Sequence, residues 1–368
     1  MAVLPLIPTQ LVGSWCKPKW LCDHDAVYGP EGTWWKVSES DLAEAQDDAF
    51  HLAVCDQHSA GLTIVGDGEQ RRQTFSGHFY SIEGIDSAEQ AEVTDMSNDV
   101  GEYLTMKARP ASTDARGADD APPAPPKFTQ PRVVSPLKWT GPILSGHGEA
   151  LRSATSGLTK ITIIGPTTLA LRLVDQHYGS LKQVAFALAD VLNQEAKALV
   201  AQGIDVIQFD EPEVHFRYSQ VADFATEALD RAVAGLDAHT CVHVCYGYSK
   251  NIAEKRSTPV YKQAVELLAA SKVDDISLEY EQPKHGPELL EHTGSKGVAL
   301  GVLNLDTEAP AETPDHIAQS ASDAISVIGP ERLRLAPDCG MWFLPRSTAT
   351  AKIAAMEQAA ITLRAAHS

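Results

Sequence analysis

The stretch Cys241-Val-His-Val-Cys-Tyr-Gly247 decides how the rest of the chain is interpreted. Its valines alternate with cysteine and histidine, and this period of two predicts a strand whose His243 and Cys245 side chains lie on the same face. An imidazole next to a thiol provides half of a zinc site. The remaining ligands of such a zinc site have to come from elsewhere in the chain. The alternative is a strand with a packed cysteine and a hydrogen-bonded histidine.

Strands of the same kind recur on both sides of this stretch, and helices separate most of them. We expect strands near positions 11, 63, 162, 206, 242, 276, 300 and 334. The intervening helices are predicted over residues 38–60, 180–202, 221–235, 259–271, 286–292, 313–328 and 347–366. Eight such βα units favour an α/β fold, a (β/α)₈ TIM barrel formed by residues 1–368 as a single domain. A doubly wound open sheet is the alternative.

An insertion after the second strand interrupts this pattern. Residues from about 80 to 139 show neither a helical nor a strand period, so this stretch is predicted to be irregular. Within it, residues 114–131 are rich in alanine, proline, aspartate and glycine, a composition typical of a flexible, exposed loop.

The charge of the chain excludes several classes of partner. Its 49 acidic and 30 basic residues give a formal net charge of -19, which argues against nucleic acids and anionic membranes. Residues 1–5 lack the basic start of a signal peptide, and no apolar stretch approaches transmembrane length. The six cysteines are then expected to be free thiols or metal ligands in a reducing cytoplasm.

Two later strand ends supply the missing half of the metal site. Glu279 and Cys339 each follow a predicted strand, and the carboxyl ends of all strands of a barrel meet at one mouth. Thiolates and imidazole suit zinc better than calcium or magnesium. The predicted Zn²⁺ ligands are His243, Cys245, Glu279 and Cys339. Zinc held by cysteine favours chemistry in which a substrate thiol attacks an alkyl donor, and a closed structural zinc site is the alternative.

Residues at other strand ends are candidates for binding the rest of such a substrate. Glu69 and Asp210 are expected to bind an ammonium group, and the backbone N–H groups at Gly13-Ser14 a carboxylate. Ion pairing of the two acids with an arginine is the alternative, and the candidates are Arg71, Arg72 and Arg217.

Four strand-end motifs follow one another along the chain: Gln208-Phe-Asp-Glu-Pro212, His243-Val-Cys-Tyr246, Asp275-Ile-Ser-Leu-Glu279 and Pro337-Asp-Cys-Gly340. Together they resemble the catalytic barrel of the cobalamin-independent methionine synthase family, and Gly13-Ser14 and Asp67-Gly-Glu69 extend the resemblance to nearly the whole chain. The resemblance implies a zinc-dependent methyltransferase that makes methionine by methyl transfer to the sulfur of homocysteine. It also implies that Ser14 binds the carboxylate of homocysteine, and that Glu69 and Asp210 bind its amino group.

Three departures from the family pattern concern the methyl donor and the proton transfers. The chain has one barrel where the full-length synthase has two, and Arg172 stands where the family has a tryptophan that stacks on folate. The family's Asp-Ile-His segment reads Asp306-Thr-Glu308, so Asp306 and Glu308 are the candidate catalytic residues, with loop capping as the alternative. The donor is therefore expected to be either methyltetrahydrofolate or methylcobalamin, the latter carried by a corrinoid protein.

Two other functions fit the same zinc ligands. The related epoxyalkane:coenzyme M transferases use zinc and a thiol to open epoxides. Glu69 and Asp210 favour an amino-thiol over coenzyme M, because a sulfonate prefers lysine or arginine. A zinc-stabilised barrel that acts as a sensor or binding partner is the alternative outside enzymology.

Overall fold

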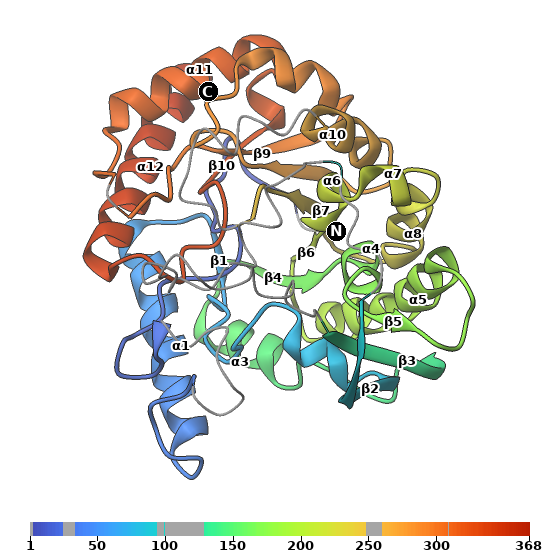
Figure 1. The fold of residues 1–368 in the computed structure, drawn as a ribbon. Helices are drawn as coiled ribbons and strands as arrows, with labels where there is room; N and C mark the ends of the chain where they lie inside the picture. Colours follow the sequence, from blue (N-terminus) through green and yellow to red (C-terminus); the bar gives the residue numbers. More distant parts are fainter. Residues whose placement is uncertain (1–2, 25–33, 94–98, 100–128, 248–259, 308) are drawn as a thin grey trace, which may run out of the picture.

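A parallel sheet of seven strands forms the centre of the computed structural model, which describes residues 3–24, 34–93, 99, 129–247, 260–307 and 309–368. The strands lie side by side in the order in which they occur in the chain, and the sheet curls around the centre of the molecule (Figure 1). They are β1 (Ile64–Gly66), β4 (Leu158–Ile164), β6 (Val206–Asp210), β7 (His239–Val244), β8 (Asp275–Leu278), β9 (Gly297–Gly301) and β10 (Leu333–Ala336). The predicted α/β fold with a parallel, barrel-like sheet is confirmed.

The N-terminal segment joins the two edge strands of this sheet. Thr9 forms a parallel bridge with Leu335 of β10, and Gln10 forms one with Ile64 of β1. The strand predicted near position 11 is thus present only as two isolated bridges, and the sheet counts seven strands rather than eight among the described residues. These bridges place the N-terminal segment in the position that an eighth strand would occupy.

Helices connect successive strands and cover the outer face of the sheet (Figure 1). The α-helices are α1 (Leu42–Ala60), α3 (His147–Ala154), α4 (Pro166–Ala170), α5 (Leu181–Ala201), α6 (Glu213–Phe216), α7 (Tyr218–Val221), α8 (Ala225–Ala232), α10 (Tyr261–Ala269), α11 (Pro314–Ile328) and α12 (Arg346–His367). Short 3₁₀ helices are η2 (Gly77–Ser81), η3 (Pro287–Thr293) and η4 (Pro330–Arg332). On α5, Val184, Leu188 and Leu192 are buried at a spacing of four residues, which gives this helix an apolar face toward the sheet.

The insertion after β1 contributes two of the three strands of a second, smaller sheet. Strand β2 (Glu83–Glu92) pairs with β3 (Thr129–Lys138) in antiparallel orientation, and β5 (Val174–Asp175) adds to β3 in parallel. The prediction of an irregular insertion is therefore wrong for residues 83–92 and 129–138. The predicted loop at 114–131 is wrong for residues 129–131, which belong to β3, and its remaining residues lie outside the described part of the chain.

No helix in the described part of the chain is both long enough and apolar enough to cross a bilayer.

Candidate metal centre and substrate site

Three of the four predicted metal ligands lie together at the carboxyl ends of the strands. His243 belongs to β7, Cys245 follows this strand, and Cys339 follows β10. The potential ligand atoms of these three residues all lie within 4.8 Å of one another, and the side chains are buried. Strands β8 and β9 separate β7 from β10 in the sheet, so it is the curl of the sheet that brings Cys339 to the other two residues.

The imidazole of His243 is fixed through one of its two nitrogens. Ser277 lies opposite His243 on the neighbouring strand β8, and its Oγ is 3.0 Å from Nδ1. The other nitrogen, Nε2, is buried and has no hydrogen-bond partner. Metal-ligating histidines commonly bond through the second nitrogen to a neighbouring polar group, and His243 follows this arrangement. One imidazole nitrogen and two sulfurs form a donor set that fits zinc.

The thiol of Cys245 is in an environment that favours the thiolate. Its hydrogen bond with Cys339 and the charge of His243 hold the pKa of Cys245 well below its usual value, although burial opposes this. The backbone N–H of Gly247 also donates to Cys245 Sγ at 3.3 Å. Burial alone would lower the pKa of His243, but the neighbouring Cys245 thiolate raises it overall. The cluster therefore presents sulfur in the form that binds metals.

Glu279, the fourth predicted ligand, lies next to the cluster but is not among the mutually close ligand atoms. It follows β8 and is fully buried. Its Oε2 accepts a hydrogen bond from the backbone N–H of Tyr246 at 2.7 Å, and its own N–H donates to the hydroxyl of Tyr261 at 3.0 Å. Its carboxylate thus borders Tyr246, the residue after Cys245, and its role as a ligand stays a prediction.

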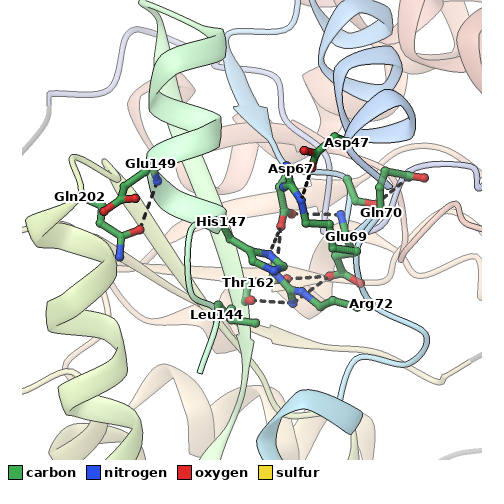
Figure 2. A network of polar contacts seen from close by, with 12 residues as sticks. Asp47, Asp67, Glu69, Gln70, Arg72, Leu144, His147, Glu149, Thr162 and Gln202 are labelled. Atoms are coloured by element: carbon green, nitrogen blue, oxygen red, sulfur yellow. Dashed lines mark hydrogen bonds and ion pairs between the residues drawn. The ribbon is translucent and has the colours of Figure 1, made fainter. Parts of the chain in front are cut away.

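Glu69 lies in a tight turn after β1 with its carboxylate packed inside the site (Figure 2). Its φ of 56° lies in the left-handed region, and Thr162 of β4 donates from Oγ1 to Glu69 Oε1 at 2.6 Å. A Cβ atom at Gly13 would lie only 2.4 Å from the same oxygen. Glycine at position 13 therefore leaves the space in which the Glu69 carboxylate sits.

Asp210 ends β6 beside the cluster of His243, Cys245 and Cys339. It is in register with His243 on the neighbouring strand β7, and Gln208 Nε2 donates to its Oδ1 at 2.8 Å. Desolvation by the surrounding protein and the nearby charge of Glu69 raise the pKa of Asp210 to about 7, although His243 and the hydrogen bond from Gln208 oppose this. The two predicted substrate-binding acids are therefore close enough to influence each other.

Comparison with known protein families shows to which family the chain belongs. The family model described as the cobalamin-independent synthase catalytic domain matches residues 148–362, which is more than half of the chain. The chain belongs to the cobalamin-independent methionine synthase family. The resemblance inferred from the four strand-end motifs is confirmed, and membership of this family implies a methyltransferase.

Relatives of this methionine synthase family match along nearly the whole chain. The methionine synthase of Sulfurisphaera tokodaii is 30% identical over 355 residues, covering 96% of this chain and 91% of the relative. The methionine synthase of Saccharolobus solfataricus is 29% identical over 367 residues, covering 99% of this chain and 97% of the relative. Among solved structures, a B12-independent methionine synthase from Shewanella sp. W3-18-1 in complex with selenomethionine has a TM-score of 0.82 at 30% identity, covering 98% of this chain and 99% of that one.

The remaining residues predicted from the methionine synthase pattern are placed as follows. Ser14 is buried, its Oγ has no hydrogen-bond partner, and its carbonyl oxygen accepts from the N–H of Met341 at 2.8 Å. Asp306 is half-buried, and its N–H donates to Asn304 Oδ1 at 2.8 Å in a local turn. Glu308 lies outside the described residues.

Arg172, which we expect at the position of the family's folate-stacking tryptophan, is tied into the surrounding structure. Its Nη2 is 2.8 Å from Glu213 Oε1, and its guanidinium lies 4.7 Å from the centre of the Phe75 ring. Stacking and pairing of this kind use the planar face and the charge of arginine at the same time.

Asp338 precedes Cys339 and was not predicted to have a role in the site. Its carboxylate accepts three hydrogen bonds from the backbone N–H groups of Tyr280, Glu281 and Gln282 at 3.1, 2.9 and 2.5 Å. Burial and the charge of Glu279 raise the pKa of Asp338 to about 7, although the hydrogen bonds from these N–H groups lower it. Asp338 thus ties the loop after β8 to the end of β10, and the only sequence signal for it is its place in the Pro-Asp-Cys-Gly motif.

Proposed function

We propose that the chain is a zinc-dependent methyltransferase that transfers a methyl group to the thiol of homocysteine. The observation that carries this proposal is the buried cluster of His243, Cys245 and Cys339 beside Asp210, with Glu69 close enough to Asp210 to affect its pKa. The cluster suits a thiol-activating metal, and the acids suit an ammonium group on the same substrate. Homocysteine carries both groups, and membership of the methionine synthase family supports this choice.

The residues that would hold zinc are His243, Cys245 and Cys339, with Glu279 as the fourth ligand. Bound there, zinc would supply a positive charge that keeps a coordinating thiol deprotonated at neutral pH. Ser277 holds the imidazole so that Nε2 remains free to bind, and Gly247 supports the Cys245 thiolate through its N–H. Asp338 accepts hydrogen bonds from the loop after β8 and so fixes the backbone next to Glu279.

The amino acid end of the substrate would be bound by Ser14, Glu69 and Asp210. Glu69 and Asp210 would accept hydrogen bonds from the ammonium group, and Ser14 would bind the carboxylate through its N–H and hydroxyl. The buried and unpartnered Ser14 Oγ supports this assignment, because buried hydroxyls ordinarily have a partner. Asp306, and Glu308 beyond it, are proposed to move protons during the transfer.

The methyl donor is proposed to be methyltetrahydrofolate or methylcobalamin, the latter on a corrinoid protein. Arg172 is occupied by Glu213 and Phe75, and it cannot offer the flat apolar surface that a tryptophan gives to a pterin ring. We therefore expect methylcobalamin to be the better donor.

The proposal is tested by measuring methionine formation from homocysteine with each donor, using the zinc-loaded full chain. We expect methionine with at least one donor, and a higher rate with methylcobalamin than with methyltetrahydrofolate. Coenzyme M in place of homocysteine is the control acceptor, and we expect it to be methylated poorly. Methylation of coenzyme M but not of homocysteine would contradict the proposal and favour the epoxyalkane:coenzyme M type of reaction.

A further inference from the structure

The carboxylate of Glu69 lies beside the buried charge of Arg72, one of the three arginines considered above as its ion-pair partner (Figure 2). The Nη1 atom of Arg72 is 3.9 Å from Glu69 Oε1, and the Arg72 side chain is 2% exposed. Among the described residues, Arg72 is the only cation with a nitrogen within 4.0 Å of this carboxylate. The hydroxyl of Thr162 donates to the same oxygen at 2.6 Å.

We propose that Arg72 is a positioning residue for the substrate's ammonium group, acting by holding the Glu69 carboxylate in place. This inference rests on the proposed function, in which Glu69 binds that ammonium group. Arg72 would not touch the substrate, and its effect would pass through Glu69.

Arg72 is itself held rigidly from two sides. Its Nη1 donates to the carbonyl oxygen of Thr162 at 2.9 Å, and its Nη2 lies 3.3 Å from Asp67 Oδ2. His147, the first residue of α3, lies on the far side of Asp67, with its Nδ1 3.2 Å from the same Oδ2. A guanidinium fixed from two sides offers a charge at a defined position.

Asp67 links this support to the backbone of Glu69. Its Oδ1 accepts a hydrogen bond from the N–H of Glu69 at 3.0 Å, while its Oδ2 faces Arg72. The left-handed conformation of Glu69 is disfavoured for a residue with a side chain, so this hydrogen bond helps to hold it. One carboxylate therefore fixes both the turn that carries Glu69 and the cation beside its side chain.

The position of Asp210 explains why a cation is needed here. Glu69 is 8% exposed and close enough to Asp210 to raise the pKa of that residue. Two buried carboxylates near each other disfavour full ionisation of both. Lys17 is also near, but its Nζ donates to the backbone oxygen of Glu69 rather than to the carboxylate. Arg72 supplies the charge that balances the pair of acids.

The test compares two thiols that differ only in the amino group. Homocysteine and its analogue without the amino group, 4-mercaptobutanoate, are titrated into the zinc-loaded full chain, into Arg72→Gln and into Arg71→Gln. Arg71 is the matched control, because this adjacent arginine pairs with Asp47 at the surface. We expect wild type and Arg71→Gln to prefer homocysteine. In Arg72→Gln this preference should fall by about tenfold, with the affinity for 4-mercaptobutanoate unchanged.

Two further variants separate positioning from a general role in folding. Arg72→Lys keeps the charge and should keep most of the preference for homocysteine. Asp67→Asn retains an acceptor for the N–H of Glu69 and weakens the hold on Arg72, so it should lower the preference in the same direction; it also serves as the test if Arg72→Gln does not fold.

The outcomes distinguish this inference from the function on which it rests. Equal loss of affinity for both thiols in Arg72→Gln would show a structural role and overturn the inference, and so would an unchanged preference for homocysteine. A wild type that binds neither thiol, or binds both equally well, would contradict the role of Glu69 in the proposed function and the inference with it.

Discussion

Two thiols and an imidazole buried within 4.8 Å of one another form a site in which Cys245 and His243 shift each other's pKa. The Cys245 thiolate is favoured by its hydrogen bond with Cys339 and by the charge of His243. A buried negative charge is costly unless a cation is close. A soft divalent ion balances this charge and uses all three ligand atoms, so at the residue scale the cluster fits zinc better than a set of packing residues.

Loss of one thiol should therefore remove the metal. We expect the purified wild type to contain about one zinc ion per chain, and Cys339→Ser to bind zinc about 100-fold more weakly or worse, because a hydroxyl is a poor substitute for a thiolate. Metal analysis after dialysis measures both. The control is Cys241→Ser in β7, a buried cysteine outside the cluster, and this variant should retain its zinc. Equal zinc contents in Cys339→Ser and wild type would contradict the assignment.

The contacts within the site show which of its residues could be predicted from the sequence. His243, Cys245 and Cys339 were predicted together because each follows or ends a strand with a clear pattern. The sequence offered Arg72 only as one of three arginines that could pair with Glu69 or Asp210, and it gave Asp338 no role. The contacts that fix these two residues include a carbonyl group distant in sequence and backbone N–H groups. Thr162 lies 90 residues from Arg72, and no local pattern predicts such a pair.

At the scale of elements, the start of helix α4 is organised by a buried acid from the neighbouring unit. Glu211 follows β6 and accepts hydrogen bonds from the N–H groups of Thr167 and Thr168 at 3.0 and 2.7 Å. A Cβ atom at Gly165 would lie 2.2 Å from the Glu211 carboxyl carbon, so glycine is required there. The carboxylate thus satisfies two N–H groups at the start of a helix that have no partner within it.

This acid should make stability depend on pH. Burial raises the pKa of Glu211 from 4.5 to about 7, although the two N–H groups oppose this. The folded state then holds the proton more tightly than the unfolded chain, so this stabilisation is complete below pH 4.5 and is lost as the pH rises through about 7. Relative to Glu211→Gln, the unfolding free energy of wild type should fall by about 3 kcal/mol across this range.

Denaturant unfolding of both proteins at several pH values measures this difference. Glu211→Gln is the natural reference, because glutamine has a similar shape and does not titrate. Parallel stability curves for the two proteins would show that Glu211 does not cause the effect.

The same scale shows why the strands of the insertion were missed. In β2, Glu83–Glu92, most side chains are exposed and polar, so the strand has no alternation of apolar residues. In β3, Pro131 and Pro136 interrupt the pattern that predicts a strand. These two strands form by pairing with each other, and neither sequence alone predicts a strand. The strands of the main sheet were predictable because they are buried on both faces and alternate with helices.

At the scale of the whole molecule, contacts between the two ends of the chain hold the N-terminal segment in the gap between β10 and β1. Glu357 of α12 accepts a hydrogen bond from Thr9 Oγ1 at 2.5 Å and pairs with Arg364 Nη1 at 2.7 Å. Arg364 Nη2 donates in turn to the carbonyl oxygen of Ile7 at 3.0 Å. The last helix thereby fixes the segment that joins the two edges of the sheet and carries Gly13 and Ser14 into the site.

Removing Glu357 should weaken the whole fold. We expect Glu357→Ala to lower the unfolding free energy by about 2–3 kcal/mol, because it removes the largely buried carboxylate that Arg364 and Thr9 both contact. Chemical denaturation measures the loss. Glu227→Ala is the control, because it breaks an exposed pair with Arg231 within one helix and should cost about 0.5 kcal/mol or less. Similar losses in the two variants would contradict a special role for the contact between the chain ends.

The central claim is that a metal held by His243, Cys245 and Cys339 activates the thiol of an amino-thiol substrate. Calorimetric titration of homocysteine into the zinc-loaded protein tests it most directly, when repeated in buffers with different ionisation enthalpies. The account predicts that homocysteine binds with release of about one proton near neutral pH, and that coenzyme M binds more weakly. Absence of homocysteine binding, or binding without proton release, would contradict it.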